Sequence, residues 1–269
     1  LAMPLSPKLQ ELIDGITPTD PNMMKRASIR QARLTKPPGS LGRLEEISVK
    51  LAGIFGSSRP AVAGRSLVIA AGDHGVVAQG VTAYPSEITG QMVLNFLSGG
   101  AAATAMARSL DVKVTVVDAG VKSDLPEHPD LISLRIGPGT SDISVGPAMS
   151  RDQAERCVLE GARIGAEVAA AGNGLVATGD MGIGNTTPSS AITAAITGMP
   201  PEVTTGRGTG RSSEELRRKT EVVARVLETN QPNGDDPLDV LSKVGGFEIG
   251  VLAGVMLGTA SRGSAVVID

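Results

Sequence analysis

The sequence predicts an α/β fold, a mostly parallel sheet flanked by helices, with a small helical annex from the N-terminal segment. Four short apolar runs, rich in β-branched residues, each end in an acid or a glycine; they cover residues 66–75, 112–120, 174–182 and 264–269. Amphipathic or alanine-rich stretches separate them. Near-continuous apolar strands that alternate with helices are typical of a parallel sheet covered on both faces.

The elements follow from local patterns along the chain. Residues 6–15 and 24–34 predict two short helices around the breaker ITPTDPN, and a third helix is expected from Arg43, after TKPPGSLG. We expect residues 1–55 to form the helical annex and residues 56–269 the α/β domain. Within that domain, helices are predicted over 87–109, 151–172, 212–230 and 246–262.

The composition narrows the class of protein. The chain of 269 residues is 41% apolar and 20% charged, which is ordinary for a soluble globular protein. One tyrosine, three phenylalanines and no tryptophan predict an aliphatic core and argue against a protein that stacks nucleic-acid bases. A net charge of −3 also disfavours a nucleic-acid partner. No run of about 20 uncharged apolar residues predicts a membrane span.

Cysteine and histidine are scarce. Cys157 is the one cysteine and lies in a helical pattern, so we expect a buried, apolar thiol and no intrachain disulfide. This fits a reducing compartment, and the expected location is the cytoplasm. With His74 and His128 as the two histidines, a histidine-rich metal site is not expected.

The two ends of the sequence are unusual. It starts at Leu1 without an initiator methionine, and it stops within SAVVID, a pattern typical of a buried strand. We therefore expect the gene product to continue beyond Asp269.

Acidic residues follow each of the four predicted strands. They are Asp73, Asp118, Asp180 and Asp269. In open parallel sheets, ligands bind outside the carboxyl ends of the strands. The sequence therefore predicts that the functional site lies at this edge of the sheet.

The segment ATGDMGIGNTTPSSAI is the strongest candidate for a binding loop. Gly182 and Gly184 allow a ligand to approach the backbone closely, and Asn185, Thr186 and Thr187 stand where the next helix begins. The N–H groups and the dipole of a helix N-terminus suit a phosphate. A well-capped strand–turn–helix without a ligand is the alternative interpretation of this pattern.

A second glycine-rich loop precedes a helix in EVTTGRGTGRSSEELRRK. It lacks the G-x-G-x-x-G pattern after a strand, which disfavours a dinucleotide-dependent oxidoreductase. Two such loops in one domain predict a phosphorylated ligand held from two sides. The residues of interest in this loop are Gly206, Gly208 and Gly210, with the cations Arg207, Arg211 and Lys219.

The carboxylate of Asp180 and the side chains of residues 70–93 suggest which groups the ligand carries besides a phosphate. A carboxylate is a poor neighbour for a phosphate but suits a ribose, a developing cation or a proton to be removed. Tyr84, Ser86 and Gln91 are candidates for an aromatic-base pocket, although a plain helix N-terminus explains them equally well. His74 is expected to be structural. Together these features suggest a nucleotide whose glycosidic bond is to be broken.

Six motifs occur in an order that is characteristic of one family. They are TKPPGSLGRLE (35–45), AGDHGV (71–76), AYPSEITGQMV (83–93), GDMGIGNTT (179–187), TGRGTG (205–210) and KVGGFEIGVLAGVMLG (243–258). Over nearly its whole length the chain resembles the nicotinate-nucleotide–dimethylbenzimidazole phosphoribosyltransferases.

The resemblance implies a glycosyl (pentosyl) transfer in cobalamin biosynthesis. The family moves 5-phosphoribose from nicotinate mononucleotide to 5,6-dimethylbenzimidazole, and yields α-ribazole 5′-phosphate and nicotinate with inversion at the anomeric carbon. It implies no metal and no organic cofactor. The implied fold is Rossmann-like, with a small helical domain made from the chain ends, and the implied assembly is a homodimer.

The resemblance also implies roles for individual residues. The 5′-phosphate would contact Gly182, Asn185, Thr186, Gly208 and Gly210, with Lys219 nearby, and Gln91 and Ser86 would belong to the base pocket. Asp180, which we assign as catalytic, stands where the family commonly has a glutamate. The family's general-base glutamate lies in a G-E-G-S-G segment that follows the last of these 269 residues. A nucleotide-phosphate-binding module without catalysis is therefore the alternative.

Overall fold

The sheet forms the centre of the molecule. The computed structural model describes residues 3–208 and 212–268. All strand pairs in these residues are parallel, and the strand order is β3-β2-β1-β4-β5. The strands are β1 (Arg65–Gly72), β2 (Lys113–Gly120), β3 (Leu131–Ser133), β4 (Leu175–Met181) and β5 (Ala265–Val267). The prediction of a parallel α/β fold is therefore confirmed.

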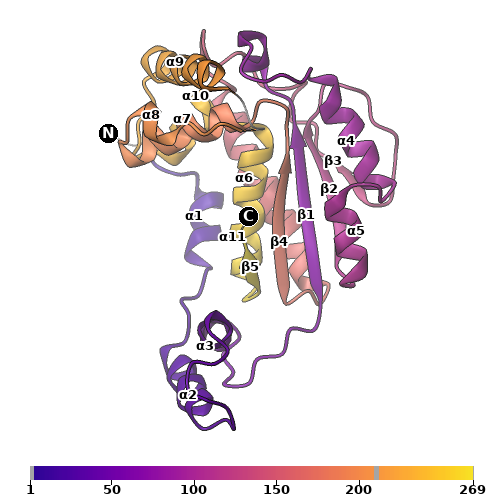
Figure 1. Cartoon of the computed structure of the whole chain (residues 1–269), viewed down its shortest axis with the longest axis vertical. Coiled ribbons are helices and arrows are strands. Elements are labelled where there is room, and N and C mark those ends of the chain that lie inside the picture. Colours follow the sequence, from indigo (N-terminus) through magenta and orange to yellow (C-terminus); the bar gives the residue numbers. More distant parts are fainter. Residues whose placement is uncertain (1–2, 209–211, 269) are drawn as a thin grey trace.

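Helices cover both faces of the sheet (Figure 1). One face carries α4 (Glu87–Leu97) and α5 (Ala102–Ser109), and the other carries α6 (Arg151–Ala170) and α11 (Phe247–Ser261). The stretch predicted to be helical over 87–109 is divided into two helices, α4 and α5. The chain turns between α4 and α5, where Gly99 has a φ of +73°, a conformation that glycine adopts readily.

The pair α6 and α11 is packed more closely than ordinary helices. A Cβ atom at Gly161 would clash with the carbonyl group of Val251, and one at Gly258 would clash with that of Ala162. The two backbones therefore touch. Most of α11 is buried, and its sequence contains no charged residue after Glu248. This contact and the aliphatic side chains around it form the main core.

The start of a helix is marked in the sequence by its capping residues. Ser150 and Gln153 form a capping box at the start of α6, and Ser212 and Glu215 form another at the start of α9 (Ser213–Asn230). Such reciprocal bonds satisfy backbone N–H groups that have no partner inside the helix. They explain why these two helices begin close to the positions that the sequence predicts.

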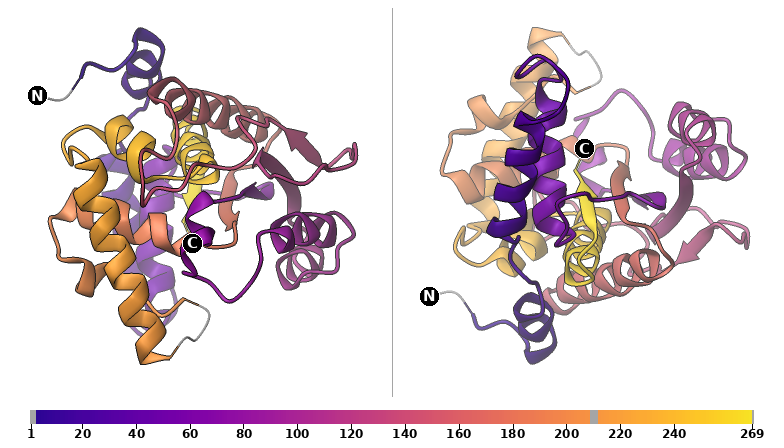
Figure 2. Two further views of the ribbon diagram at one scale, coloured as in Figure 1. Left: turned by 90° about the horizontal axis from the view of Figure 1, so that it is seen from above. Right: turned by 90° about the horizontal axis from the view of Figure 1, so that it is seen from below.

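A further group of helices lies around the carboxyl ends of the strands (Figures 1 and 2). Besides α9, it contains the 3₁₀-helix η1 (Gly75–Gln79), α7 (Thr186–Thr197), α8 (Pro201–Thr204) and α10 (Pro237–Val244). The position of α7 confirms the helix expected after the first glycine-rich loop. The sequence patterns did not indicate α10 or the short strand β3.

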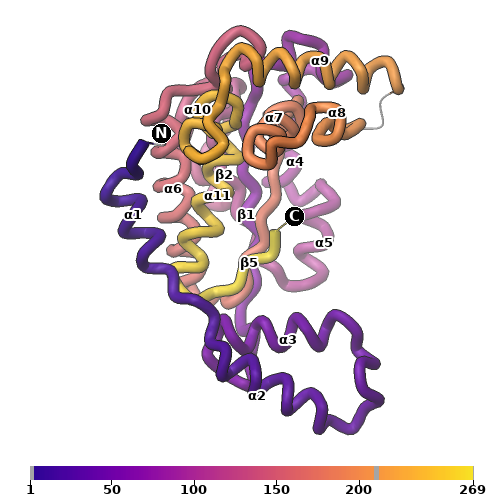
Figure 3. The backbone as a smooth tube through the Cα atoms, turned by 90° about the vertical axis from the view of Figure 1, so that its left-hand side faces the viewer, coloured from indigo at the N-terminus to yellow at the C-terminus, as the bar shows by residue number. Residues whose placement is uncertain are grey.

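The N-terminal helices occupy two places. Helix α1 (Pro7–Asp14) packs against α11 and buries Leu9 in the main core. Helices α2 (Pro21–Ala32) and α3 (Arg43–Ile54) pack against each other beyond the amino ends of the strands, opposite α9 (Figure 3). The three helices are confirmed, while the division into an annex of residues 1–55 and a domain of residues 56–269 stays a prediction. Within the residues described, no helix is both long and apolar enough to cross a membrane.

Candidate active site

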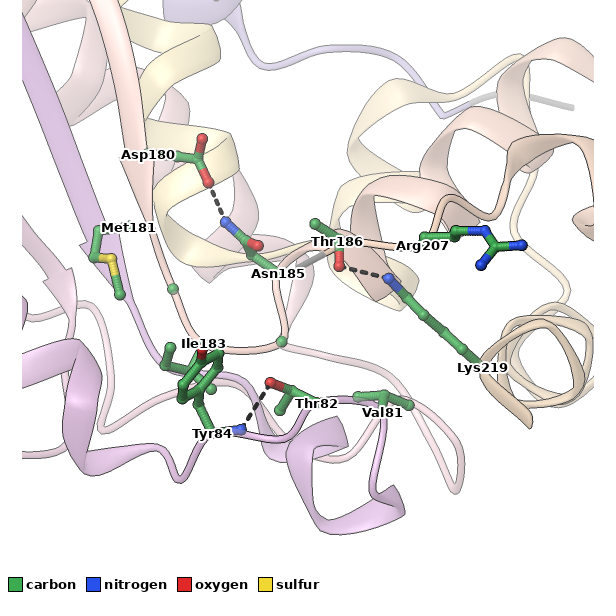
Figure 4. A pocket seen from close by; sticks show the side chains of 13 residues that line it. Val81, Thr82, Tyr84, Asp180, Met181, Ile183, Asn185, Thr186, Arg207 and Lys219 are labelled. Atoms are coloured by element: carbon green, nitrogen blue, oxygen red, sulfur yellow. Dashed lines mark hydrogen bonds between the residues drawn. The ribbon is translucent and has the colours of Figure 1, made fainter. Parts of the chain in front are cut away.

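A cavity opens where the carboxyl ends of β1 and β4 lie side by side. The chain builds β2 and β3 on one side of β1 and then crosses to build β4 and β5 on the other, so this is the switch point of the sheet. The cavity has a volume of about 370 Å³, and Figure 4 shows its side chains. Its lining comes from residues 81, 82, 84, 180–186 and 207–208, with Lys219.

The first wall is the turn from β4 into α7. A Cβ atom at Gly182 would lie 2.5 Å from the carbonyl oxygen of Gly72, and Gly184 has a φ of +88°, so the turn requires small residues. Asn185 then stands at the N-cap of α7, and its side-chain Nδ2 donates a hydrogen bond to Asp180 Oδ2. The carboxylate is thereby held at the cavity, beside the N-terminus of a helix.

The second wall is the loop before α9, and Lys219 joins it to the first. Lys219 Nζ donates to Thr186 Oγ1 at 2.6 Å and lies 3.5 Å from the carbonyl oxygen of Gly206. A Cβ atom at Gly208 would be 3.6 Å from both Lys219 Nζ and Thr186 Oγ1. The two glycine-rich loops therefore meet at a lysine whose residue surface is only 2% exposed.

This meeting point has the chemistry of an anion site. The ammonium group of Lys219 and the first turn of α7 lie at the same cavity, and Arg207 also lines it. A helix N-terminus carries a partial positive charge, and charge-assisted hydrogen bonds from lysine or arginine are the strongest that a phosphate can accept. Figure 4 shows Arg207 and Lys219 on the same side of the cavity, with Asp180 across from them.

The structure brings most of the predicted site residues to one cavity. They are Asp180, Gly182, Gly184, Asn185, Thr186, Gly208 and Lys219. Thr187 lies in the same segment, but its side chain is fully buried in the protein and does not line the cavity. Gly210 lies outside the described residues.

The predicted base-pocket residues lie apart from this lining. Ser86 stands at the N-cap of α4, and Gln91 is exposed on the same helix; neither lines the cavity. Tyr84, just before α4, does line it, together with Met181 and Ile183. These side chains offer an aromatic and apolar surface next to Asp180. The sequence singles out Tyr84 but gives no such signal for Met181 or Ile183.

The other strand-end acids serve the backbone. Asp73 Oδ2 accepts a hydrogen bond from the backbone N–H of Lys122 at 2.8 Å, and Asp118 Oδ1 accepts one from Val121 at 2.8 Å. Burial raises the pKa of the Asp118 carboxyl group, although the hydrogen bond from Val121 opposes the shift. Both acids lie at the predicted edge of the sheet, but they shape the loops there instead of facing the cavity. Asp269 lies outside the described residues.

Three further residues line the cavity: Arg207, Val81 and Thr82. Arg207 belongs to the G-R-G motif of the second loop, where its cation suits an anionic ligand. Val81 and Thr82 precede Tyr84, and the sequence gives no signal for these two residues. Within residues 3–208 and 212–268, no group of three or more His, Cys, Asp and Glu side chains is arranged so that it could hold a metal ion.

Comparison with known proteins agrees with this geometry. A phosphoribosyltransferase family model matches residues 16–269. The nicotinate-nucleotide–dimethylbenzimidazole phosphoribosyltransferase of Roseiflexus sp. (strain RS-1) is 53% identical, with 97% of this chain and 74% of the relative covered. The enzyme of the same name from Deinococcus radiodurans is 47% identical, with 98% and 73% covered.

Solved structures lead to the same family. The crystal structure of CobT from Thermus thermophilus superposes with a TM-score of 0.88 at 47% identity, covering 93% of this chain and 74% of that one. The chain thus spans about three quarters of the length of these relatives. The parallel sheet, the cavity at its switch point and these similarities agree with the sequence motifs: the chain belongs to the nicotinate-nucleotide–dimethylbenzimidazole phosphoribosyltransferase family.

Proposed function

We propose that this protein transfers 5-phosphoribose from nicotinate mononucleotide to 5,6-dimethylbenzimidazole. The products are α-ribazole 5′-phosphate and nicotinate, and the configuration at the anomeric carbon inverts. The named relatives, which are 53% and 47% identical over nearly the whole chain, support this activity. Within the structure, the supporting observation is the hydrogen bond from Lys219 to Thr186, which joins two glycine-rich loops at one cavity.

The phosphate end of the donor is assigned to this junction. Thr186 opens α7, and Gly208 leaves the space beside Lys219 Nζ without a side chain. A 5′-phosphate there would accept hydrogen bonds from the lysine, from the Thr186 hydroxyl and from the first N–H groups of α7. We also assign Gly182, Gly184 and Asn185 to this phosphate subsite, and Thr187 and Gly210 remain predicted members of it.

The sugar and leaving group are assigned to the side of Asp180. A lone pair on a benzimidazole ring nitrogen attacks C1′ as the bond from C1′ to nicotinate breaks, and that electron pair neutralises the pyridinium nitrogen. The benzimidazole N–H proton is lost to a base. Positive charge builds on the ribose in this step, and a fixed carboxylate beside it lowers the barrier. Asp180, oriented by Asn185, is the acid that we assign to this role.

The planar acceptor is assigned to the apolar side of the cavity. Tyr84, Met181 and Ile183 can contact a flat aromatic ring, because they line the cavity next to Asp180. Ser86 is the N-cap of α4, the helix that follows Tyr84, and Gln91 lies within that helix; both remain predicted polar contacts of the base. We further propose, from the family resemblance, a cytoplasmic homodimer that supplies the lower ligand of cobalamin and needs neither metal nor organic cofactor.

An assay of product formation tests the transfer. The protein is incubated with nicotinate mononucleotide in the presence and absence of 5,6-dimethylbenzimidazole, and nicotinate and α-ribazole 5′-phosphate are quantified by mass spectrometry. We expect equal amounts of the two products and nicotinate release that depends on the acceptor. Binding of the nucleotide without either product would favour the alternative of a binding module, which the names of the relatives do not support. Nicotinate release without the acceptor would indicate hydrolysis.

A further inference from the structure

A buried ion pair lies directly behind the cavity. His74 follows β1, and Glu248 lies in the first turn of α11. The distance from His74 Nε2 to Glu248 Oε1 is 2.7 Å, and their side chains are 1% and 0% exposed. Neither side chain has a further hydrogen-bond partner within the described residues. The assigned roles of the cavity residues leave this pair unexplained.

Three glycines make room for the pair. A Cβ atom at Gly182 would lie 2.9 Å from His74 Nε2, and one at Gly246 would lie 2.6 Å from His74 Cε1. On the other side, a Cβ atom at Gly72 would lie 2.6 Å from Glu248 Oε2. The imidazole and the carboxylate therefore occupy space that side chains would otherwise take, and they hold the ends of β1 and β4 and the start of α11 at a set separation.

The pair contacts the site through Gly182. This residue lines the cavity with one side of its backbone, and the imidazole of His74 packs against it. Asp180 and Gly184, on either side of it in the chain, also line the cavity. A change in the position of the His74 ring would thus move the segment that carries Asp180 and leads into α7.

The charge of the pair matters as much as its shape. Burial lowers the pKa of His74, but Glu248, and after it Asp73 and Asp180, raise it by a larger amount, so the net shift is upward. Within the described residues, the carboxylates whose charges raise this pKa are Glu248 of α11, Asp73 at the end of β1 and Asp180 of β4. A protonated His74 cancels the charge of Glu248. Without it, a buried carboxylate would lie behind the cavity and repel an anionic ligand.

We propose that His74 and Glu248 are positioning residues, a buried imidazolium–carboxylate pair that holds the Asp180–Gly184 segment in its binding geometry and neutralises the layer behind the phosphate subsite. The proposal rests on the proposed function, since it assumes that the ligand of the cavity carries a phosphate. It assigns no contact between the pair and the ligand.

Two measurements test the pair, with the variant His74→Gln/Glu248→Gln. Two amides can still hydrogen-bond to each other, so this variant removes both charges and keeps most of the volume. The matched control is Arg151→Gln/Asp236→Asn. It removes the ion pair between Arg151 Nη1 and Asp236 Oδ2, which are 3.0 Å apart and do not line the cavity. Circular dichroism and thermal melting first establish that both variants are folded.

Calorimetry then gives the Kd for nicotinate mononucleotide from about pH 5.5 to about pH 9.5, a range that extends from below to well above the ordinary pKa of histidine. We expect the His74/Glu248 variant to bind about ten-fold more weakly or worse near neutral pH, because small misplacements of site residues are costly. We also expect the wild type to lose affinity at alkaline pH, a step absent from that variant. The control should bind like the wild type. Unchanged affinity and pH dependence in the His74/Glu248 variant would overturn the proposal.

Hydrogen exchange separates this inference from the proposed function. It follows the backbone amides of residues 180–185 without any ligand, and we expect faster exchange in the His74/Glu248 variant than in the wild type or the control. If the wild type does not bind the nucleotide, the proposed function fails, and the exchange rates still decide whether the pair positions the loop. Equal exchange in all three proteins would refute the positioning role.

Discussion

Lys219 Nζ and Thr186 Oγ1 are 2.6 Å apart, and this hydrogen bond connects α9 with the first residue of α7. It is a direct link between the two glycine-rich loops, because Gly206 and Gly208 of the second loop also lie beside the same ammonium group. A buried cation at the junction of the two loops suits the phosphate of the proposed donor, because charge-assisted hydrogen bonds to phosphate oxygens are strong.

Replacing this lysine tests the phosphate subsite. In Lys219→Met the chain length is kept and the charge is lost, and hydrogen bonds to charged groups contribute about 1.5–3 kcal/mol. We therefore expect the Kd for nicotinate mononucleotide to rise roughly 10- to 100-fold in calorimetry. Lys243→Met is the control, because Lys243 pairs with Asp239 at 2.9 Å, does not line the cavity and should leave the Kd unchanged. An equal loss in both variants would contradict the assignment.

Asp180→Asn tests the proposed electrostatic role in the transfer. The amide has nearly the same shape but no charge, so the developing positive charge on the ribose loses its counter-charge. We expect kcat to fall by about 10²–10³-fold, as for other preorganised charge stabilisers, while the Kd for nicotinate mononucleotide changes little. Product formation under single-turnover conditions gives the rate. Asp180→Glu should retain much of the activity, and a normal rate in Asp180→Asn would show that the carboxylate is not catalytic.

The contact between α6 and α11 is the most sensitive part of the core. A methyl group at Gly258 would clash with the carbonyl group of Ala162, so Gly258→Ala forces two buried helices apart. Overpacking of this kind costs about 1–3 kcal/mol or more, although alanine alone favours a helix over glycine by about 1 kcal/mol. Urea unfolding should therefore show a net loss of stability. Gly146→Ala, at a position with no neighbouring atom within 4 Å, should be nearly neutral.

The stability of the fold should depend on pH through His74. Its folded-state pKa is raised above the ordinary value of 6.5, because burial, which lowers it, is outweighed by Glu248 together with Asp73 and Asp180. A raised pKa means that the native state binds the proton more tightly, so the contribution is complete below about pH 6.5 and is lost as the pH rises through the folded-state pKa. The free energy of unfolding, measured in urea, should fall over this range relative to His74→Gln/Glu248→Gln. Parallel pH profiles would exclude the effect.

Cys157 should be inert in the native protein. The residue is fully buried, and burial raises the pKa of its thiol to about 12, so almost no thiolate forms at neutral pH. We expect iodoacetamide to label it only in denaturant, or at the rate of unfolding, as followed by mass spectrometry. Rapid labelling of the folded protein would mean that the helix around Cys157 opens without global unfolding.

Much of the site followed from residues that are adjacent in the sequence. The turn from β4 into α7 was recognisable because Gly182, Gly184, Asn185 and Thr186 carry their own conformational and capping preferences, which act over a few residues. Ser86, Gln91 and Thr187 are close in sequence to residues that line the cavity, yet they do not line the cavity themselves. The side of a helix or loop that faces a cavity depends on what packs against its other side.

Local patterns were too weak to predict the elements that were missed. The strand β3 contains three residues, too few for a periodic signal, and α10 is short. The helix predicted over 87–109 is two helices, because the glycines between them permit a turn that the apolar pattern alone does not reveal. Such outcomes depend on which neighbours the segment meets in the folded chain.

The sequence alone determined the parallel α/β class, the two glycine-rich loops that precede helices, and the family. The signals for these features, which are β-branched runs, capping residues and long motifs, each lie within one segment of the chain. The tertiary structure decided which of these parts meet. It placed Lys219 between the two loops and buried His74 against Glu248. Contacts between residues so far apart in the chain depend on how β1, β4, α9 and α11 pack, and packing is a property of the whole core rather than of any one segment.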